Sequence, residues 1–73
     1  MRTLKPEDVG KFVVLWRHNG KQPAKVLEVK HPHIQYEIVD GPEKGEKFNN
    51  VFDFTQDINI FDTAESALAA CGT

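Results

Sequence analysis

Residues 11–30 read KFVVLWRHNGKQPAKVLEVK, which places an Asn-Gly pair, Asn19-Gly20, between two runs rich in apolar residues. Asn and Gly tolerate the positive φ angles that a two-residue type I′ turn requires, so this pair is a strong hairpin signal. We therefore expect residues 11–17 and 22–29 to form two antiparallel strands joined by a tight turn.

The turn determines which side chains share a face of the hairpin. If Asn19 and Gly20 are the turn residues, Leu15 lies opposite Ala24 and Val13 opposite Val26, which makes one face wholly apolar. The other face is also largely apolar, because it pairs Phe12 with Leu27, Trp16 with Pro23 and Val14 with Lys25. A bulge near Pro23 would shift this pairing by one residue.

A hairpin with one solvated side alternates apolar and polar residues, so the second face of this hairpin needs a cover. The sequence is compatible with three different covers. The C-terminal segment of the chain can pack there, a second copy or another protein can dock there, or the aromatic residues can form a cage for a ligand. Trp16 lies on this face, and Trp is enriched among the residues that dominate binding energy at interfaces.

The composition narrows the class of protein. The chain has 73 residues, which we expect to form a single domain, and its only cysteine, Cys71, rules out an intramolecular disulfide. No Cys/His cluster has the spacing of a zinc site, and no apolar run approaches the roughly 20 residues that span a bilayer. With no signal peptide either, we expect a cytoplasmic protein that does not contact a membrane.

The net charge of −2 is unevenly distributed along the chain. Residues 1–36 carry a formal charge of +4 and all three histidines, whereas residues 37–73 carry −6. The first hairpin therefore lies in a basic half, and its charged residues either bind an anionic partner or pair with the acidic half.

The rest of the chain predicts further short elements. We expect a helical turn at 5–10, strands at 33–39, 46–51 and 58–61, a polar loop at 40–45 and a 3₁₀ turn at 54–57. In the segment 33–39, Ile34, Tyr36 and Ile38 alternate with polar residues, so these three side chains face the core.

The C-terminal segment 62–71 predicts a short helix. Asp62 is expected to cap it, with Glu65 completing a capping box, and Gly72 is expected to end it. Its apolar stripe comprises Ala64, Ala67, Leu68 and Cys71. A helix of this length does not persist alone, so it must dock on the rest of the domain.

Four segments, VGKFV at 9–13, AKVL at 24–27, YEIVDG at 36–41 and DINI at 57–60, resemble in their order the SH3-like small β-barrels of the Tudor or KOW kind. The resemblance covers about residues 8–61. It implies a mainly β fold, with a single five-stranded antiparallel barrel over residues 11–61 followed by the helix at 62–71. It also implies a non-catalytic module that binds peptides, methylated side chains or nucleic acid.

No motif indicates catalysis. The chain has no nucleophile elbow, phosphate-binding loop or HExxH motif. His31 and His33 flank Pro32, but no third ligand has a recognisable spacing. We therefore expect no enzymatic activity, no cofactor and no metal.

We expect a binding module for a protein partner, regulatory or inhibitory in character, that docks on the outer face of the first hairpin. The expected contact residues are Phe12, Trp16, Arg17, His18, Lys21 and Lys25, with Trp16 as the anchor. Nucleic acid bound by the same basic hairpin is the alternative, since an aromatic ring among cations suits phosphates and bases. A second alternative is a Tudor-like reader of methylated side chains, and a homodimer is also open.

Overall fold

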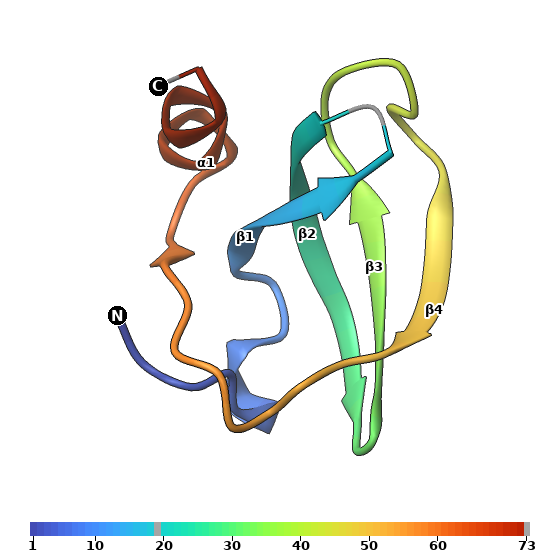
Figure 1. The fold of residues 1–73 in the computed structure, drawn as a ribbon, viewed down its shortest axis with the longest axis vertical. Helices are drawn as coiled ribbons and strands as arrows, with labels where there is room; N and C mark the ends of the chain where they lie inside the picture. Colours follow the sequence, from blue (N-terminus) through green and yellow to red (C-terminus); the bar gives the residue numbers. More distant parts are fainter. Residues whose placement is uncertain (19, 73) are drawn as a thin grey trace.

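The computed structural model describes residues 1–18 and 20–72. Its elements are η1 (Pro6–Asp8, a 3₁₀ turn), β1 (Phe12–Arg17), β2 (Gly20–Lys30), β3 (His33–Ile38), β4 (Lys47–Val51), β5 (Ile60–Phe61) and α1 (Ala64–Cys71). The strands form one antiparallel sheet in the order β4-β3-β2-β1-β5 (Figure 1). Strands β4 and β5 are its edges, so this part of the chain is a mainly β fold built on an open sheet. No helix within it has the length and apolarity needed to cross a membrane.

The first hairpin forms as predicted, but its register is different. Leu15 lies opposite Gln22 rather than Ala24, and every partner in β2 is displaced by two residues. Gly20 has a φ of 102° and is the first residue of β2, although the sequence had assigned it to the turn. The predicted type I′ turn also includes Asn19, which lies outside the described residues. Because side chains alternate with a period of two, a two-residue shift keeps each side chain on its predicted face.

The irregularity in β2 lies farther along the strand than the sequence suggested. The described β2–β3 ladder shifts its register between Val26 and Glu28, not near Pro23. The Pro23 carbonyl accepts a hydrogen bond of 3.0 Å from the Val39 N–H. Because Val39 lies just beyond the end of β3, the bond that the missing N–H of Pro23 cannot make falls at the end of the ladder rather than within it.

The core lies on one face of the curved sheet. The prediction that Ile34, Tyr36 and Ile38 face it together is confirmed, because all three are buried. The other buried members of this core are Leu4, Val13, Ala24 and Val26.

The segment that leads from β4 to α1 differs from its prediction in two places. The predicted 3₁₀ turn at 54–57 is a simple turn in which the Gln56 N–H donates to the Asp53 carbonyl at 3.3 Å. Strand β5 begins at Ile60, because Ile58 instead forms an isolated bridge with Arg2. Ile58, at the start of the predicted strand, therefore pairs with the N-terminal segment rather than with β1.

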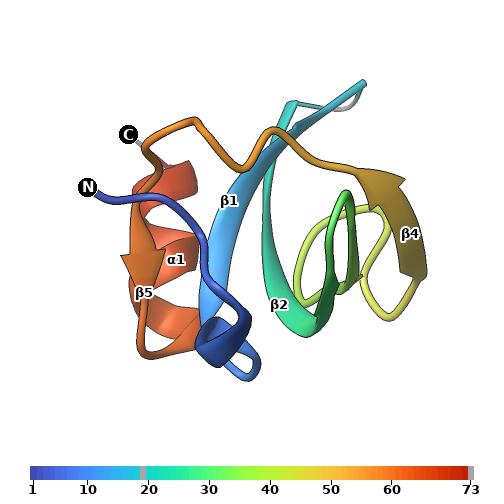
Figure 2. The same ribbon diagram turned by 90° about the horizontal axis from the view of Figure 1, so that it is seen from below.

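Helix α1 packs on the opposite face of the sheet, against β1, β2 and β5 (Figure 2). The chain's own helix is therefore one cover of the second hairpin face, and Pro23 on that face is buried. This cover is incomplete, since Trp16 at the far end of β1 has a side chain that is 78% exposed.

The caps and the packing face of α1 differ in part from the prediction. Thr63 rather than Asp62 is the N-cap, and its hydroxyl oxygen accepts the Ser66 N–H at 3.1 Å. Asp62 instead pairs with Lys11, which precedes β1. Gly72 is the C-cap, as predicted. Within the predicted stripe Ala67 is fully buried, but Leu68 is 44% exposed, since α1 packs against the sheet on the side that carries Ala67.

This close approach of α1 to the sheet predicts an asymmetric response to substitution. Ala67→Leu should lower the free energy of unfolding by about 1–3 kcal/mol, because the site has no room for a larger side chain. Leu68→Ala is the matched control and should cost less than about 1 kcal/mol, since much of that side chain is already in water. Urea unfolding followed by circular dichroism measures both, and an equal loss in the two variants would contradict this packing.

Candidate functional site

Trp16 is the most conspicuous surface residue of the sheet. It lies one residue before the end of β1, opposite Lys21 of β2, and the Lys21 Nζ lies 5.3 Å from the centroid of its ring. Large apolar side chains lose favourable free energy when they stay in water, and this one stays exposed although a helix covers the sheet beside it. Trp16 also borders two hollows, one on each side of β1.

The first of these, which we call the seam hollow, lies where the ends of β1 and β4 approach each other. It has a volume of about 210 Å³. Leu15, Trp16 and Arg17 line it from β1, and Ile34, Tyr36, Asn50, Val51 and Phe52 line it from the other side. Val51 is itself an exposed apolar residue, so two exposed apolar side chains, Trp16 and Val51, line this hollow.

A polar network forms one end of the seam hollow. Arg17 Nε and Nη2 donate to the two carboxylate oxygens of Glu43 at 3.1 and 3.2 Å, and Arg17 Nη1 donates to the Tyr36 hydroxyl at 3.0 Å. Asn50 Nδ2 donates to the same hydroxyl at 2.7 Å. The guanidinium also lies 4.0 Å from the centroid of the Phe48 ring. These contacts fix the arginine fork in one orientation.

The same contacts correct the expected role of Arg17. The hydrogen bonds from Arg17 lower the pKa of Glu43, and the Glu43 carboxylate in turn raises the pKa of Arg17. Both groups are therefore charged and held together at neutral pH. Arg17 points to the core face, as its odd position in β1 requires, and it is not part of a basic rim on the face of Lys21 and Lys25.

The second hollow, which we call the helix-side hollow, lies on the face of the sheet that carries α1. It has a volume of about 250 Å³, and its lining includes Val14, Trp16, Lys21, Ile58 and Phe61. Met1, another exposed apolar residue, also borders it. Trp16 is the one residue of β1 that lines both hollows.

The remaining expected contact residues fall into two groups. His18 and Lys21 are exposed and lie beside Trp16 at the end of the hairpin. Phe12 and Lys25 lie opposite each other about 13 Å farther along the strands, and Phe12 is partly covered by its partner in β5. The structure therefore brings Trp16, His18 and Lys21 together and separates them from Phe12 and Lys25.

Sequence reasoning missed the residues that reach the site from distant parts of the chain. Val51 and Phe52 line the seam hollow because the end of β4 approaches β1, and Glu43 reaches Arg17 from the loop at 40–45. A signal for Arg17 was present, because it lies two and four residues after Leu15 and Val13 in the same strand and is therefore on the core face with them. No comparable signal existed for Val51, since its position depends on how strongly the sheet curves.

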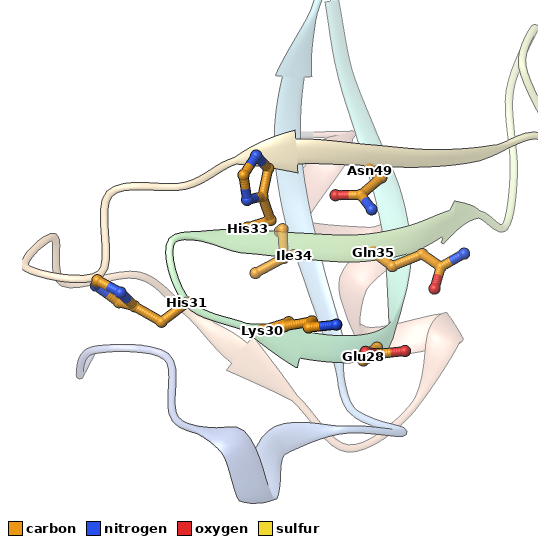
Figure 3. A pocket seen from close by; sticks show the side chains of 7 residues that line it. All are labelled: Glu28, Lys30, His31, His33, Ile34, Gln35 and Asn49. Carbon is orange, nitrogen blue, oxygen red and sulfur yellow. The ribbon is translucent and has the colours of Figure 1, made fainter.

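A third hollow lies on the polar face of β2, β3 and β4, with a volume of about 630 Å³ (Figure 3). Glu28, Lys30, His33, Gln35 and Asn49 line it, a mixture of both charges and amides that is typical of a solvated sheet face. The His31 ring packs on Phe54 with centroids 4.9 Å apart. Among the described residues, no three His, Cys, Asp or Glu side chains are placed to hold a metal ion.

Comparison with protein-family models, with curated protein sequences and with solved structures gives no match to this chain. The distinguishing feature of the candidate site is one exposed tryptophan that lies between two hollows at the end of the first hairpin.

Proposed function

We propose that this chain is a non-catalytic protein-binding module that docks its partner at the end of the first hairpin, with Trp16 as the anchor. The observation that carries the proposal is the 78% exposure of Trp16 between two hollows. A tryptophan beside a pocket offers a large rigid contact area at a small entropic cost, which is why such residues dominate many interfaces.

The surroundings of Trp16 define the chemistry of the partner. The Lys21 ammonium lies beside the ring, whereas the charge of Arg17 is already paired with that of Glu43. An apolar segment that carries an acidic residue complements this arrangement. Cys71 is a lone, partly buried thiol, so we also place the module in a reducing compartment such as the cytoplasm.

We further propose that the curved sheet is an SH3-like small barrel. Its support is the unbroken antiparallel order β4-β3-β2-β1-β5, in which the last strand returns to the first, and a core enclosed on one face of the sheet. The binding proposal does not depend on this assignment, because it follows from Trp16 and its two hollows.

Nucleic acid is the rival ligand, because Trp16 beside Lys21 also suits a stacked base and a phosphate. Its weakness is the small number of cations that the structure leaves at the site once Arg17 is paired. The two functions differ in salt dependence, since phosphate binding weakens steeply as salt rises and an apolar contact does not.

Trp16→Ala should abolish most of the peptide binding. We suggest selecting 12-residue peptides from a random display library against the full chain and measuring their affinity by isothermal titration calorimetry. Loss of a hot-spot tryptophan typically costs 2 kcal/mol or more, so affinity should fall by about 30-fold or more. The fold should survive, because the side chain contributes little to the core.

Leu68→Ala is the control, since it removes another exposed apolar side chain on a different part of the surface and should leave affinity unchanged. A library that yields no binders, or binders that Trp16→Ala retains at full affinity, would contradict the proposal. Tight, salt-sensitive binding of a single-stranded oligonucleotide in place of peptides would favour the rival.

A further inference from the structure

The free edge of β1 begins at Val14, just beyond the last residue that pairs with β5. Strand β5 pairs only with the first two residues of β1, Phe12 and Val13. The described pairing with β1 stops at Ile60, and Ile58 pairs with Arg2 on the other side of this segment through hydrogen bonds of 2.9 and 3.2 Å. Among the described residues, no strand pairs with the segment Val14–Arg17 on this side.

The direction of the backbone groups along this edge follows from the ladder. The Val26 N–H donates to the Lys11 carbonyl at 2.9 Å, so Lys11 directs its carbonyl toward β2. Backbone groups alternate in direction along an antiparallel strand, so Phe12 faces β5, and Val14 and Trp16 direct their N–H and carbonyl groups to the same outer edge. The edge therefore offers two residues whose backbone groups are oriented to pair with another strand.

The two hollows lie on opposite faces of this same edge. The seam hollow is on the core face and the helix-side hollow is on the α1 face, with Trp16 bordering both. Successive side chains of a β-strand point to opposite faces, so a strand added beside Val14–Arg17 would direct alternate side chains into the two hollows. This is the arrangement by which proteins bind extended peptides at a sheet edge.

The other edge of the sheet lacks these features. Over most of its length strand β4 presents Lys47, Asn49 and Asn50, with the exposed Val51 only at its last position, and polar or charged residues of this kind discourage pairing at an edge. The edge of β1 instead carries a tryptophan between two hollows, so it is the edge that suits an added strand.

Building on the proposed function, we propose that the partner binds as a short extended segment that adds a β-strand to the Val14–Arg17 edge of β1. An aliphatic side chain of the segment enters the seam hollow between Trp16 and Val51. A neighbouring side chain on the helix side carries a carboxylate toward Lys21, with which no carboxylate among the described residues pairs. Four residues of free edge span about 13 Å, so the core of the segment is four to six residues long.

An N-methyl scan of the tightest peptide from the display selection tests this proposal. Each residue of the peptide is methylated in turn at its backbone nitrogen, and the affinity for the unmodified protein is measured. In an added strand, every second N–H donates to β1, so methylation should lower affinity about tenfold or more at alternate positions. The intervening positions, whose N–H groups face solvent, should tolerate methylation with about a threefold change or less.

The outcomes separate this proposal from the proposed function. A scan without alternation, combined with loss of binding in Trp16→Ala, would overturn the added strand and leave the Trp16 anchor intact. Peptides that bind Trp16→Ala as well as the unmodified chain would overturn both. The native mass provides a further test. A mass of two chains that falls to one in Trp16→Ala would overturn the proposal, because a second copy of the chain would then occupy the edge instead of a peptide. A mass of one chain in both the unmodified protein and Trp16→Ala, with an alternating scan, supports the proposal.

Discussion

Replacing Ile38 by alanine is expected to lower the free energy of unfolding by about 3–4 kcal/mol. The side chain is 0% exposed and lies opposite Ala24 in the centre of the core. The substitution removes three carbon atoms from a site whose backbone is fixed by hydrogen bonds. The Ile38 N–H donates to the Glu46 carbonyl, and the Ile38 carbonyl accepts from the Gly45 N–H. The surroundings therefore cannot collapse into the cavity, and comparable substitutions cost 2–5 kcal/mol.

A loss of this size is a large part of the stability of so small a domain, which is typically near the lower end of 5–15 kcal/mol. Urea unfolding followed by circular dichroism measures it. Val51→Ala is the matched control, because Val51 is an exposed strand residue, and it should cost less than about 0.5 kcal/mol. Similar midpoints for the two variants would contradict the assignment of the core.

Asp8→Ala is expected to destabilise the fold by about 3 kcal/mol. The Asp8 side chain is almost fully buried, and its carboxylate accepts hydrogen bonds from Arg2 Nη1 at 2.7 Å and Nη2 at 2.6 Å. It also accepts the Lys5 N–H at 2.8 Å, which closes the η1 turn. Removing one partner of a buried pair leaves the remaining hydrogen-bonding groups unpaired, and such changes typically cost 3–5 kcal/mol. The exposure of half of Arg2 places our value at the lower end of that range.

Asp62→Ala is the control for this prediction. Asp62 also pairs with a cation, Lys11, but both partners are open to solvent, so no measurable loss of stability is expected. Equal destabilisation by the two substitutions would mean that burial of Asp8 contributes nothing.

The same carboxylate predicts how stability depends on pH. Hydrogen bonds from Arg2 hold the pKa of Asp8 below its ordinary value. A carboxyl group whose pKa is lowered by folding stabilises the folded state above its unfolded pKa of about 3.9, and this contribution is lost as the pH falls through the folded value. The unmodified protein should therefore lose stability more steeply below pH 4 than Asp8→Ala does. Parallel curves in that range would contradict this role.

The sequence predicted the faces of the sheet better than its register. Period-two alternation placed Val13, Ala24 and Val26 on the core face, and a two-residue shift does not alter that result. The register itself was predicted from the turn, but Gly20 belongs to β2, so each partner was wrong by two positions. A turn motif indicates that a hairpin forms, whereas the packing of both strands decides where pairing begins.

The exposure of Trp16 could not be read from the sequence. Trp16 and Pro23 lie on the same apolar face, yet Pro23 is buried and Trp16 is not. The difference depends on how far α1 extends, and a helix of eight residues is only about 12 Å long. The missed contribution of Val51 has a similar cause, because it depends on how the curvature of the sheet brings β4 toward β1.

The most direct test of the docking edge is backbone amide hydrogen exchange of the full chain with and without the selected peptide, read residue by residue by NMR. Without peptide, the Trp16 amide should exchange fast, because it points to an unpaired edge. With saturating peptide, it should exchange at least about tenfold more slowly, since it then donates to the added strand. Unchanged exchange at Trp16, with new protection confined to the polar face of β2, β3 and β4, would contradict the account.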